Sequence, residues 1–253
     1  MAVVNVLESY LAAMPAELAA LEQEVGELDR GYASLDRVED HLVGIATGQV
    51  AGDQRLAANR AARYAGTVLI ARTGARWALE ARDAETVCVT GFSGYAQQEC
   101  EPGDIARRVV KHPALNVGTL RDAIELCDLP LRWQELDALV RDPDARLREL
   151  CDDITAVTGR EPELDFSPAS VDAVEAALQQ AMSAGAPREL QRRMRIAAVI
   201  YLGSIAVRKL GQDQWTVRDK PGFDGFGMFR IHRWQPAANV ELVRPGSKPG
   251  KLR

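Results

Sequence analysis

The segment Arg193–Trp215, RMRIAAVIYLGSIAVRKLGQDQW, predicts a buried helix followed by a strand. Apolar residues occur almost all around its helical circumference, which is typical of a helix covered on several sides. Arg208 and Lys209 fall in the last turn, where cations favour the helix dipole, and Gly211 follows where a left-handed residue closes a helix. The apolar run is shorter than the roughly 20 residues needed to cross a bilayer. We therefore expect the central helix of a globular protein without a membrane partner.

A second copy of this pattern occurs earlier, at Ala61–Trp77, AARYAGTVLIARTGARW. Both copies read Tyr-x-Gly-[Thr/Ser]-[Val/Ile], then a second glycine, then a tryptophan. Tyr64 and Gly66 of the earlier copy thus correspond to Tyr201 and Gly203 of the later one. Upstream, LDRVEDHL at 35–42 aligns with VDAVEAAL at 171–178. Because helical composition alone does not explain the shared glycines and tryptophans, the sequence predicts an internal duplication.

The order of elements is also similar in the two halves, with helices followed by short strands. This order predicts an α+β fold of two pseudo-symmetric lobes, each with helices packed on a small antiparallel sheet. Residues 1–127 are the expected first lobe with its N-terminal helices. Residues 128–243 are the expected connector and second lobe, and the basic, proline- and glycine-rich residues 244–253 are an expected flexible tail.

Local signals place the individual elements. Leucines at helical spacing over 7–28 predict one or two amphipathic helices, kinked near Pro15. Ser34 and Asp53 are the predicted N-caps of helices that end near residues 45 and 73, and Ser167 is the predicted N-cap of a helix that begins at Pro168. The other expected elements are strands over 77–80, 86–89, 215–217 and 228–234 and helices over 104–110, 117–126 and 143–158.

The glycines of the repeated motif fall in the middle of predicted helices. There a glycine costs about 1 kcal/mol relative to alanine. We expect a strand or a neighbouring helix to approach the backbone closely at Gly66 and Gly203; a ligand pressed against this backbone is the alternative.

Composition narrows the class of protein. The chain has 253 residues, a net charge of −5 and 47% hydrophobic residues, which is ordinary for a globular protein. Mixed charges with an acidic balance disfavour general nucleic-acid binding. No secretion signal is visible at the start, which predicts a cytoplasmic location. The four cysteines show neither metal-ligand spacing nor a redox motif, so we expect inert, small buried thiols.

The Tyr-x-Gly-x-[Val/Ile], Gly, Trp pattern at a helix-to-strand junction resembles one in small bacterial proteins of unknown function, several of which accompany toxin systems as immunity proteins. The resemblance covers only a short stretch of each half. It carries no catalytic residue to this chain. It implies a binding module more than an enzyme.

Candidate binding residues come first from the places where the copies differ. Asn59, Arg60 and Arg63 give the earlier long helix a polar, cationic side, and the later helix has Ile196, Ala197 and Ile200 at these places. Unlike faces on similar lobes would form an asymmetric groove between the lobes or face a partner. A more peripheral position of the first lobe explains the same difference.

A second set of candidates lies near the end of the chain. Arg230, His232 and Trp234 alternate in a predicted strand and would share one face, where cationic and aromatic groups suit an anionic or planar ligand. An edge strand with solvated charges is the alternative.

Two carboxylate pairs, Asp36 with Glu39 and Asp172 with Glu175, lie one helical turn apart. Such pairs can serve as acid and base or bind a metal, but we interpret them as first-turn acids favoured by the helix dipole. No catalytic residue, metal site or cofactor is expected.

Two functions remain open from the sequence. The leading hypothesis is a non-enzymatic binding protein that occupies a protein partner as an immunity or neutralising factor. The alternative is a small-molecule protein, either an uncommon biosynthetic enzyme or a sequestering resistance factor, which uses a groove between the lobes. The first requires an exposed patch of interface size, and the second a deep cavity with converging polar groups.

Overall fold

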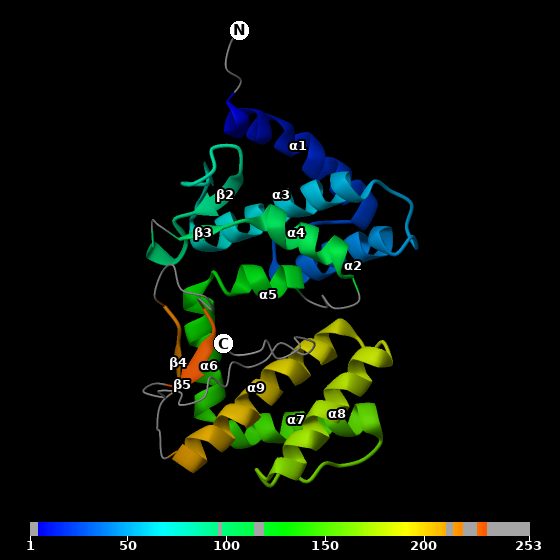
Figure 1. Cartoon of the computed structure of the whole chain (residues 1–253), viewed down its shortest axis with the longest axis vertical. Coiled ribbons are helices and arrows are strands. Elements are labelled where there is room, and N and C mark those ends of the chain that lie inside the picture. The colour runs from blue at the N-terminus through cyan, green and yellow to red at the C-terminus, as the bar shows by residue number, and fades with distance from the viewer. Residues whose placement is uncertain (1–4, 96–97, 114–118, 211–214, 220–226, 232–253) are drawn as a thin grey trace, which may run out of the picture. The chain divides into compact units, whose positions relative to one another are not determined.

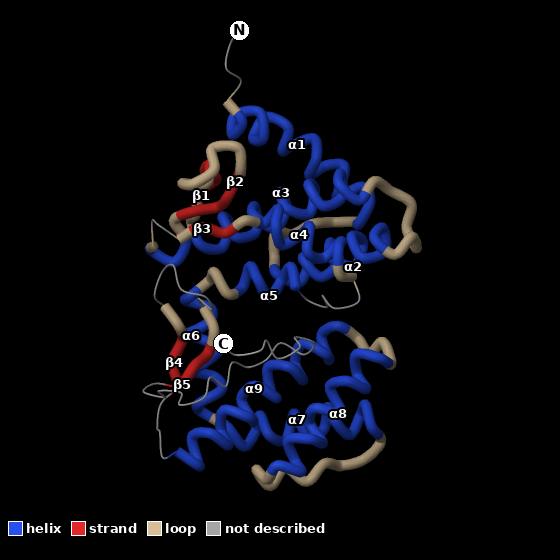
Figure 2. The backbone as a smooth tube through the Cα atoms, in the orientation of Figure 1, coloured by secondary structure: helices blue, strands red, loops and turns tan. Residues whose placement is uncertain are grey.

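A computed structural model describes residues 5–95, 98–113, 119–210, 215–219 and 227–231 of the chain (Figure 1). The chain divides into two compact units. Unit 1 comprises Met1–Trp133 and Val217–Met228, and unit 2 comprises Gln134–Thr216 and Phe229–Arg253. The described part is mostly helical, with short antiparallel strands (Figure 2). This composition agrees with the predicted α+β class.

Three helices open unit 1: α1 (Val6–Val25), α2 (Tyr32–Ala46) and α3 (Gln54–Thr73). Asp53 is the N-cap of α3, where its carboxylate accepts the N–H of Leu56 at 2.7 Å. Gly74 ends this helix in the left-handed conformation, with φ of 70°. Helix α3 is central because α1, α2, α4 (Pro102–Lys111) and α5 (Thr119–Glu125) all pack against it.

The sheet of unit 1 follows α3 in the chain. Strands β1 (Arg76–Leu79), β2 (Val87–Thr90) and β3 (Glu99–Cys100) pair antiparallel in this order, and Trp77 lies opposite Val89. A short 3-10 helix, η1 (Phe92–Gly94), follows β2. Strand β2 contacts α3 and α4, so one side of the small sheet lies on the helices, as the α+β prediction requires.

Unit 2 is built around α7 (Pro143–Thr158), α8 (Pro168–Ser183) and α9 (Arg188–Leu210). These three helices pack on one another around a shared apolar core. The buried members of this core are Leu150, Ile154, Val174, Ala177, Ala181, Met194, Ala198 and Tyr201. Two further strands, β4 (Trp215–Val217) and β5 (Phe229–Ile231), form a two-stranded sheet.

Several predicted boundaries differ from the structure. Helix α1 continues through Pro15, whereas the sequence predicted a kink or break there. Helix α2 begins at Tyr32 after Gly31, so Ser34 is not its N-cap. The predicted connector between the halves contains a second helix, α6 (Leu129–Arg141), which the sequence analysis missed. Of the strand predicted over 228–234, residues beyond 231 lie outside the described part of the chain.

Two tryptophan side chains explain why glycines occur in the middle of α3 and α9. A Cβ atom placed on Gly66 would overlap the indole ring of Trp77, the second residue of β1. A Cβ atom on Gly203 would overlap the indole of Trp215, the first residue of β4. The expected close approach is confirmed in both units, and a side chain on the strand makes it. The glycine and the tryptophan of the motif are therefore one packing unit.

The motif tyrosines also have matching environments. In unit 1 the hydroxyl of Tyr64 bonds the Ser34 hydroxyl and accepts the N–H of Arg30 at 3.0 Å. In unit 2 the hydroxyl of Tyr201 lies 2.6 Å from the Ser170 hydroxyl and accepts the N–H of Phe166 at 2.8 Å.

The backbone has the same conformation and hydrogen bond just before α2 and just before α8. Arg30 and Phe166 both have positive φ, 58° and 64°. Each follows an aspartate, Asp29 or Asp165, whose carboxylate accepts the N–H two residues further on, at 2.8 and 2.9 Å. A left-handed non-glycine residue is uncommon. Its presence at both places shows that the two segments enter their helices in the same way.

Candidate functional site

The first feature of interest is the groove between α2 and α3, which α5 fills in unit 1. Leu35 of α2 and Val68 of α3 are both 0% exposed. From α5, Leu120 and Ile124 are also completely buried, and α5 packs on both α2 and α3. The groove of unit 1 is therefore closed by a helix from the same unit.

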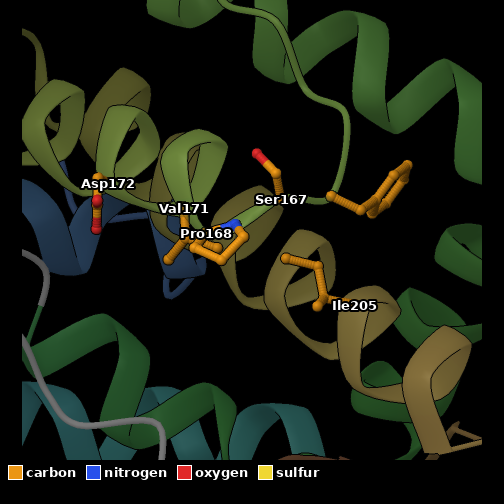
Figure 3. Close-up of a pocket in the computed structure, with 6 residues that line it drawn as sticks. Ser167, Pro168, Val171, Asp172 and Ile205 are labelled. Carbon is orange, nitrogen blue, oxygen red and sulfur yellow. The ribbon is translucent and has the colours of Figure 1, made fainter.

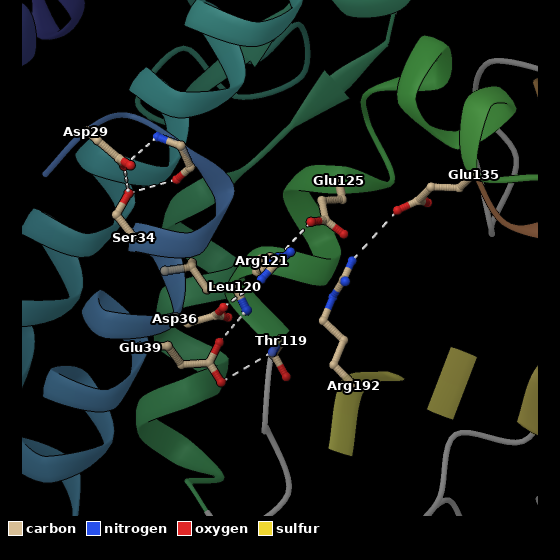
Figure 4. A network of polar contacts seen from close by, with 11 residues as sticks. Asp29, Ser34, Asp36, Glu39, Thr119, Leu120, Arg121, Glu125, Glu135 and Arg192 are labelled. Carbon is tan, nitrogen blue, oxygen red and sulfur yellow. Dashed lines mark hydrogen bonds and ion pairs between the residues drawn. The ribbon is translucent and has the colours of Figure 1, made fainter. Parts of the chain in front are cut away.

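A buried carboxylate holds the start of α5. Glu39 of α2 is 0% exposed and accepts the N–H groups of Thr119 and Leu120 at 3.3 and 2.6 Å (Figure 4). The first N–H groups of a helix have no partner inside the helix, and a negative charge is favourable beside them. Glu39 thus satisfies the N-terminus of α5 in the way that a capping residue would.

A second carboxylate of α2 holds the side chain of α5. Asp36 pairs with Arg121 at 2.8 Å, and Arg121 also pairs with Glu125 at 2.7 Å (Figure 4). Burial lowers the pKa of Arg121, but the hydrogen bonds and charges of Glu125 and Asp36 outweigh burial and raise this pKa. The guanidinium therefore stays charged between the two carboxylates.

These contacts correct the interpretation of the paired acids. Asp36 and Glu39 were expected to be first-turn acids, but α2 has no acidic residue in its first turn, and neither has α8. In unit 1 the pair instead receives a neighbouring helix. The sequence contained no signal for this role, because the residues that the pair binds lie far along the chain.

The same positions in unit 2 are open to solvent. Val171 and Ile205, which the alignment matches to Leu35 and Val68, are only partly buried. Asp172 and Glu175, which match Asp36 and Glu39, are exposed. Phe166, Ser167, Pro168, Val171, Asp172 and Ile205 line a hollow of about 280 Å³ (Figure 3). We call these six residues together with Glu175 the α8–α9 face.

The carboxylates of the α8–α9 face make few polar contacts with other described residues. Asp172 makes no hydrogen bond or ion pair with another described residue. From the described residues, Glu175 accepts only a long 3.3 Å hydrogen bond, which Gln179 donates one turn further along α8. The guanidinium of Arg208 lies 3.5 Å from the ring centre of Phe166, which lines the hollow. The face therefore combines an apolar hollow with accessible carboxylates.

The first set of sequence-predicted site residues lies on α3. Arg60 pairs with Glu17 at 2.8 Å and with Glu24 at 2.5 Å, both from α1. The hydrogen bond that Arg60 donates to the Glu17 carboxylate is the main reason why the pKa of Arg60 is raised. The cationic side of α3 thus packs against α1.

The other two members of this set differ in exposure. Arg63 lies with its guanidinium 4.2 Å from the centre of the Tyr10 ring, also on α1. Burial raises the pKa of Tyr10 to about 12, and the charge of Arg63 acts in the opposite direction. Asn59 is exposed. A binding role for Asn59, Arg60 and Arg63 stays a prediction, and the structure gives the two arginines a packing role.

The second set of sequence-predicted site residues is only partly described. Arg230 lies in β5, and its side chain is outside the described part, as are His232 and Trp234. Their shared face therefore stays a prediction.

The described residues contain neither a cluster of metal ligands nor a membrane-spanning helix. Among them, no three His, Cys, Asp or Glu side chains gather as metal ligands, and no helix is long and apolar enough to cross a membrane. Cys88, Cys100 and Cys127 are buried free thiols, as expected, whereas the free thiol of Cys151 is only partly buried. Burial raises the pKa of Cys88 to about 12, which leaves it a poor nucleophile at neutral pH.

Comparisons with family models, curated proteins and solved structures find no match to this chain.

Proposed function

We propose that this chain is a non-enzymatic binding protein that receives a protein partner on the α8–α9 face. One observation carries the proposal: the α2–α3 groove of unit 1 is closed by α5, and the matching positions Val171, Asp172 and Ile205 of unit 2 are accessible. An apolar hollow bordered by charges is a common form of protein-binding surface.

We also infer that the two three-helix segments arose by internal duplication. The same tyrosine–serine bond, the same left-handed residue and the same glycine–tryptophan overlap support this inference. Duplication would explain why the two grooves differ. The copy in unit 1 kept a helix that covers its groove, and the copy in unit 2 became free to bind a partner.

The alternative function was placed in a groove between the lobes, whereas the hollow of the α8–α9 face lies within unit 2 and is near the lower size limit of small-molecule sites. Small-molecule sites usually occupy roughly 300–1,000 Å³ and enclose most of the ligand, whereas this hollow measures about 280 Å³ and is lined mainly by Phe166, Pro168, Val171 and Ile205. A protein surface that covers the hollow and also reaches Asp172 and Glu175 fits better.

The biological role proposed is that of a cytoplasmic immunity or neutralising factor, which is what the resemblance of the repeated motif implies. A toxin gene beside the gene for this chain would support this role. A biosynthetic cluster at that place would support the small-molecule alternative.

Site-specific photocrosslinking tests the proposed function. A benzophenone amino acid replaces Val171 in one variant and Asp152, an exposed residue of α7, in a control variant. In cells that express the chain natively, we expect a single protein adduct at position 171 that is absent at position 152. The adduct should be lost when Asp172→Lys is added. Equal labelling at both positions, or an adduct indifferent to Asp172→Lys, would contradict the proposal.

A further inference from the structure

We propose that the partner presents an amphipathic helix to the α8–α9 face, with its first turn at Glu175 and a basic side chain at Asp172. This inference rests on the proposed function, because it names the chemistry of the partner that the face receives. The groove of unit 1 supplies the pattern: Glu39 holds the N-terminus of α5, and Asp36 holds Arg121.

The spacing of contacts in unit 1 defines the sequence that such a helix needs. Its first two N–H groups meet the carboxylate, as those of Thr119 and Leu120 meet Glu39. The next residue is basic, as Arg121 is. Apolar side chains one residue before and three residues after the basic residue enter the groove, as Leu120 and Ile124 do. Helices that bind in grooves commonly insert apolar side chains that are spaced in this way along one face.

The charges of the α8–α9 face favour this occupant over a purely apolar one. Asp172 and Glu175 would be covered by any protein that fills the hollow, and burying an unpaired carboxylate is costly. A helix N-terminus together with a basic side chain compensates both charges at once. An acidic segment would meet two carboxylates and be repelled.

A partner helix is a better occupant than α5 from a second copy of the chain. In unit 1, Leu120 and Ile124 of α5 are completely buried, and Arg121 pairs with Asp36 and Glu125. Exchange of α5 between copies would expose these apolar side chains and break these pairs. A helix from another protein carries no such cost.

The test uses a synthetic helix based on α5 as the probe. The peptide has the sequence of residues 117–126, VGTLRDAIEL, with a hydrocarbon staple that replaces residues 122 and 126, because isolated short peptides are marginal helices. A fluorescent label allows binding to the full-length chain to be followed by anisotropy. We expect saturable binding that Asp172→Lys weakens by about tenfold or more, whereas the control Asp152→Lys changes it less than about twofold.

Charge reversal separates a direct contact from a folding defect. A second peptide carries Asp at the position of Arg121. We expect it to bind the native chain poorly and to recover most of the lost affinity on the Asp172→Lys variant, because the ion pair is restored with opposite sign. A variant that is merely misfolded cannot recover with a changed peptide.

Three results with the peptide would overturn the inference: no saturable binding of the first peptide, binding that is insensitive to Asp172→Lys, or binding only after removal of residues 232–253. The last result would assign the face to a segment of the same chain. Dimerisation that Asp172→Lys abolishes, measured by light scattering, would assign it to a second copy. If the peptide fails but the crosslink at position 171 persists, the helix chemistry is wrong and the proposed function stands.

Discussion

The helices α1–α3 of unit 1 and α7–α9 of unit 2 share several internal contacts and differ in what covers them. Tyr64 and Tyr201 bind equivalent serines, and each mid-helix glycine packs on a strand tryptophan. In unit 1, α5 closes the α2–α3 groove through Asp36 and Glu39. In unit 2, the matching carboxylates are exposed. The difference teaches that the matching residues build similar helix packing, whereas the acids Asp36 and Glu39 hold another helix in unit 1 and the acids at the matching positions of unit 2 are exposed.

A second difference concerns the first helix of each triplet. Helix α1 packs on α3 through charges, with Arg60 between Glu17 and Glu24. At the place of Arg60, unit 2 has Ala197, which packs against the apolar core that includes Leu150 of α7. Ion pairs therefore hold α1 on α3 in unit 1, whereas in unit 2 apolar packing is combined with an ion pair between Arg193 of α9 and Asp153 of α7.

The largest expected effect tests what the units share. Gly66→Ala and Gly203→Ala each place a methyl group against an indole ring, and overpacking of this kind costs about 2–3 kcal/mol of unfolding free energy. Urea unfolding followed by circular dichroism measures the loss. Gly103→Ala in α4 is the matched control, because its new methyl group meets only the flexible Arg107 side chain. If Gly66→Ala or Gly203→Ala behaves like Gly103→Ala, the glycine–tryptophan unit is not what fixes the helix.

The next largest loss of stability should occur in unit 1 and not in unit 2. Glu39→Ala leaves the N–H groups of Thr119 and Leu120 without their acceptor in a buried place, which we expect to cost about 2 kcal/mol. Glu175→Ala should change the stability by less than about 0.5 kcal/mol, because Glu175 is exposed. Chemical unfolding of the two variants makes the comparison. Equal losses would mean that Glu175 stabilises the fold as much as Glu39 does, which would contradict an open α8–α9 face.

A smaller loss should again be common to both units. Tyr64→Phe and Tyr201→Phe each remove a hydroxyl that accepts a backbone N–H and bonds a buried serine. We expect each substitution to lower the unfolding free energy by about 1–2 kcal/mol. The two losses should agree within about 0.5 kcal/mol in thermal or urea unfolding. A loss for only one of the two variants would show that the two tyrosine hydroxyls contribute unequally to the unfolding free energy.

A smaller effect distinguishes the charged α1–α3 interface. Arg60→Ala removes the pairs with Glu17 and Glu24, whose side chains are 27% and 38% exposed. We expect a loss of about 1 kcal/mol at low salt that shrinks in 1 M NaCl, because salt screens partly exposed pairs. Unfolding at two salt concentrations provides the measurement. A loss independent of salt would indicate that the packing of the Arg60 stem, and not its charge, holds α1.

The smallest effect concerns the aspartates that precede the left-handed residues. Hydrogen bonds, chiefly from the Ser34 hydroxyl to Asp29 and from the Ser167 hydroxyl to Asp165, lower the pKa of both carboxyls below the usual 3.8. A lowered pKa contributes stability above the unfolded-state value, and this contribution is lost as the pH falls through the folded-state value. Carbon-13 titration of the carboxyl groups should place both pKa values below 3.8, and an ordinary value at either would break the match.

The sequence predicted the ends of α3 and the close approach to its backbone well because these signals are local. The N-cap Asp53, the left-handed Gly74 and the mid-helix Gly66 each require one kind of residue at one backbone position, and all three behave as expected. Ser34 was misassigned because a serine near a helix start resembles an N-cap. Its actual partner, Tyr64, lies on another helix.

The candidate site could not be predicted from the sequence in the same way. Asp36 and Glu39 look like any acidic pair on a helix, and their partners on α5 are distant in the chain. Arg60 and Arg63 looked available because the residues of α1 that cover them carry no motif. The alignment nevertheless contained part of the answer, since it matched Asp172 and Glu175 to the acids that hold α5.

The most direct test of the open face is solvent paramagnetic relaxation of methyl groups. A soluble gadolinium chelate broadens the methyl signals of residues that solvent reaches. We predict strong broadening for Val171 and Ile205 of unit 2 and little for Leu35 and Val68 of unit 1, in the same sample of the full chain. Equal protection of the four residues would contradict an open α8–α9 face, and equal broadening would contradict a groove closed by α5.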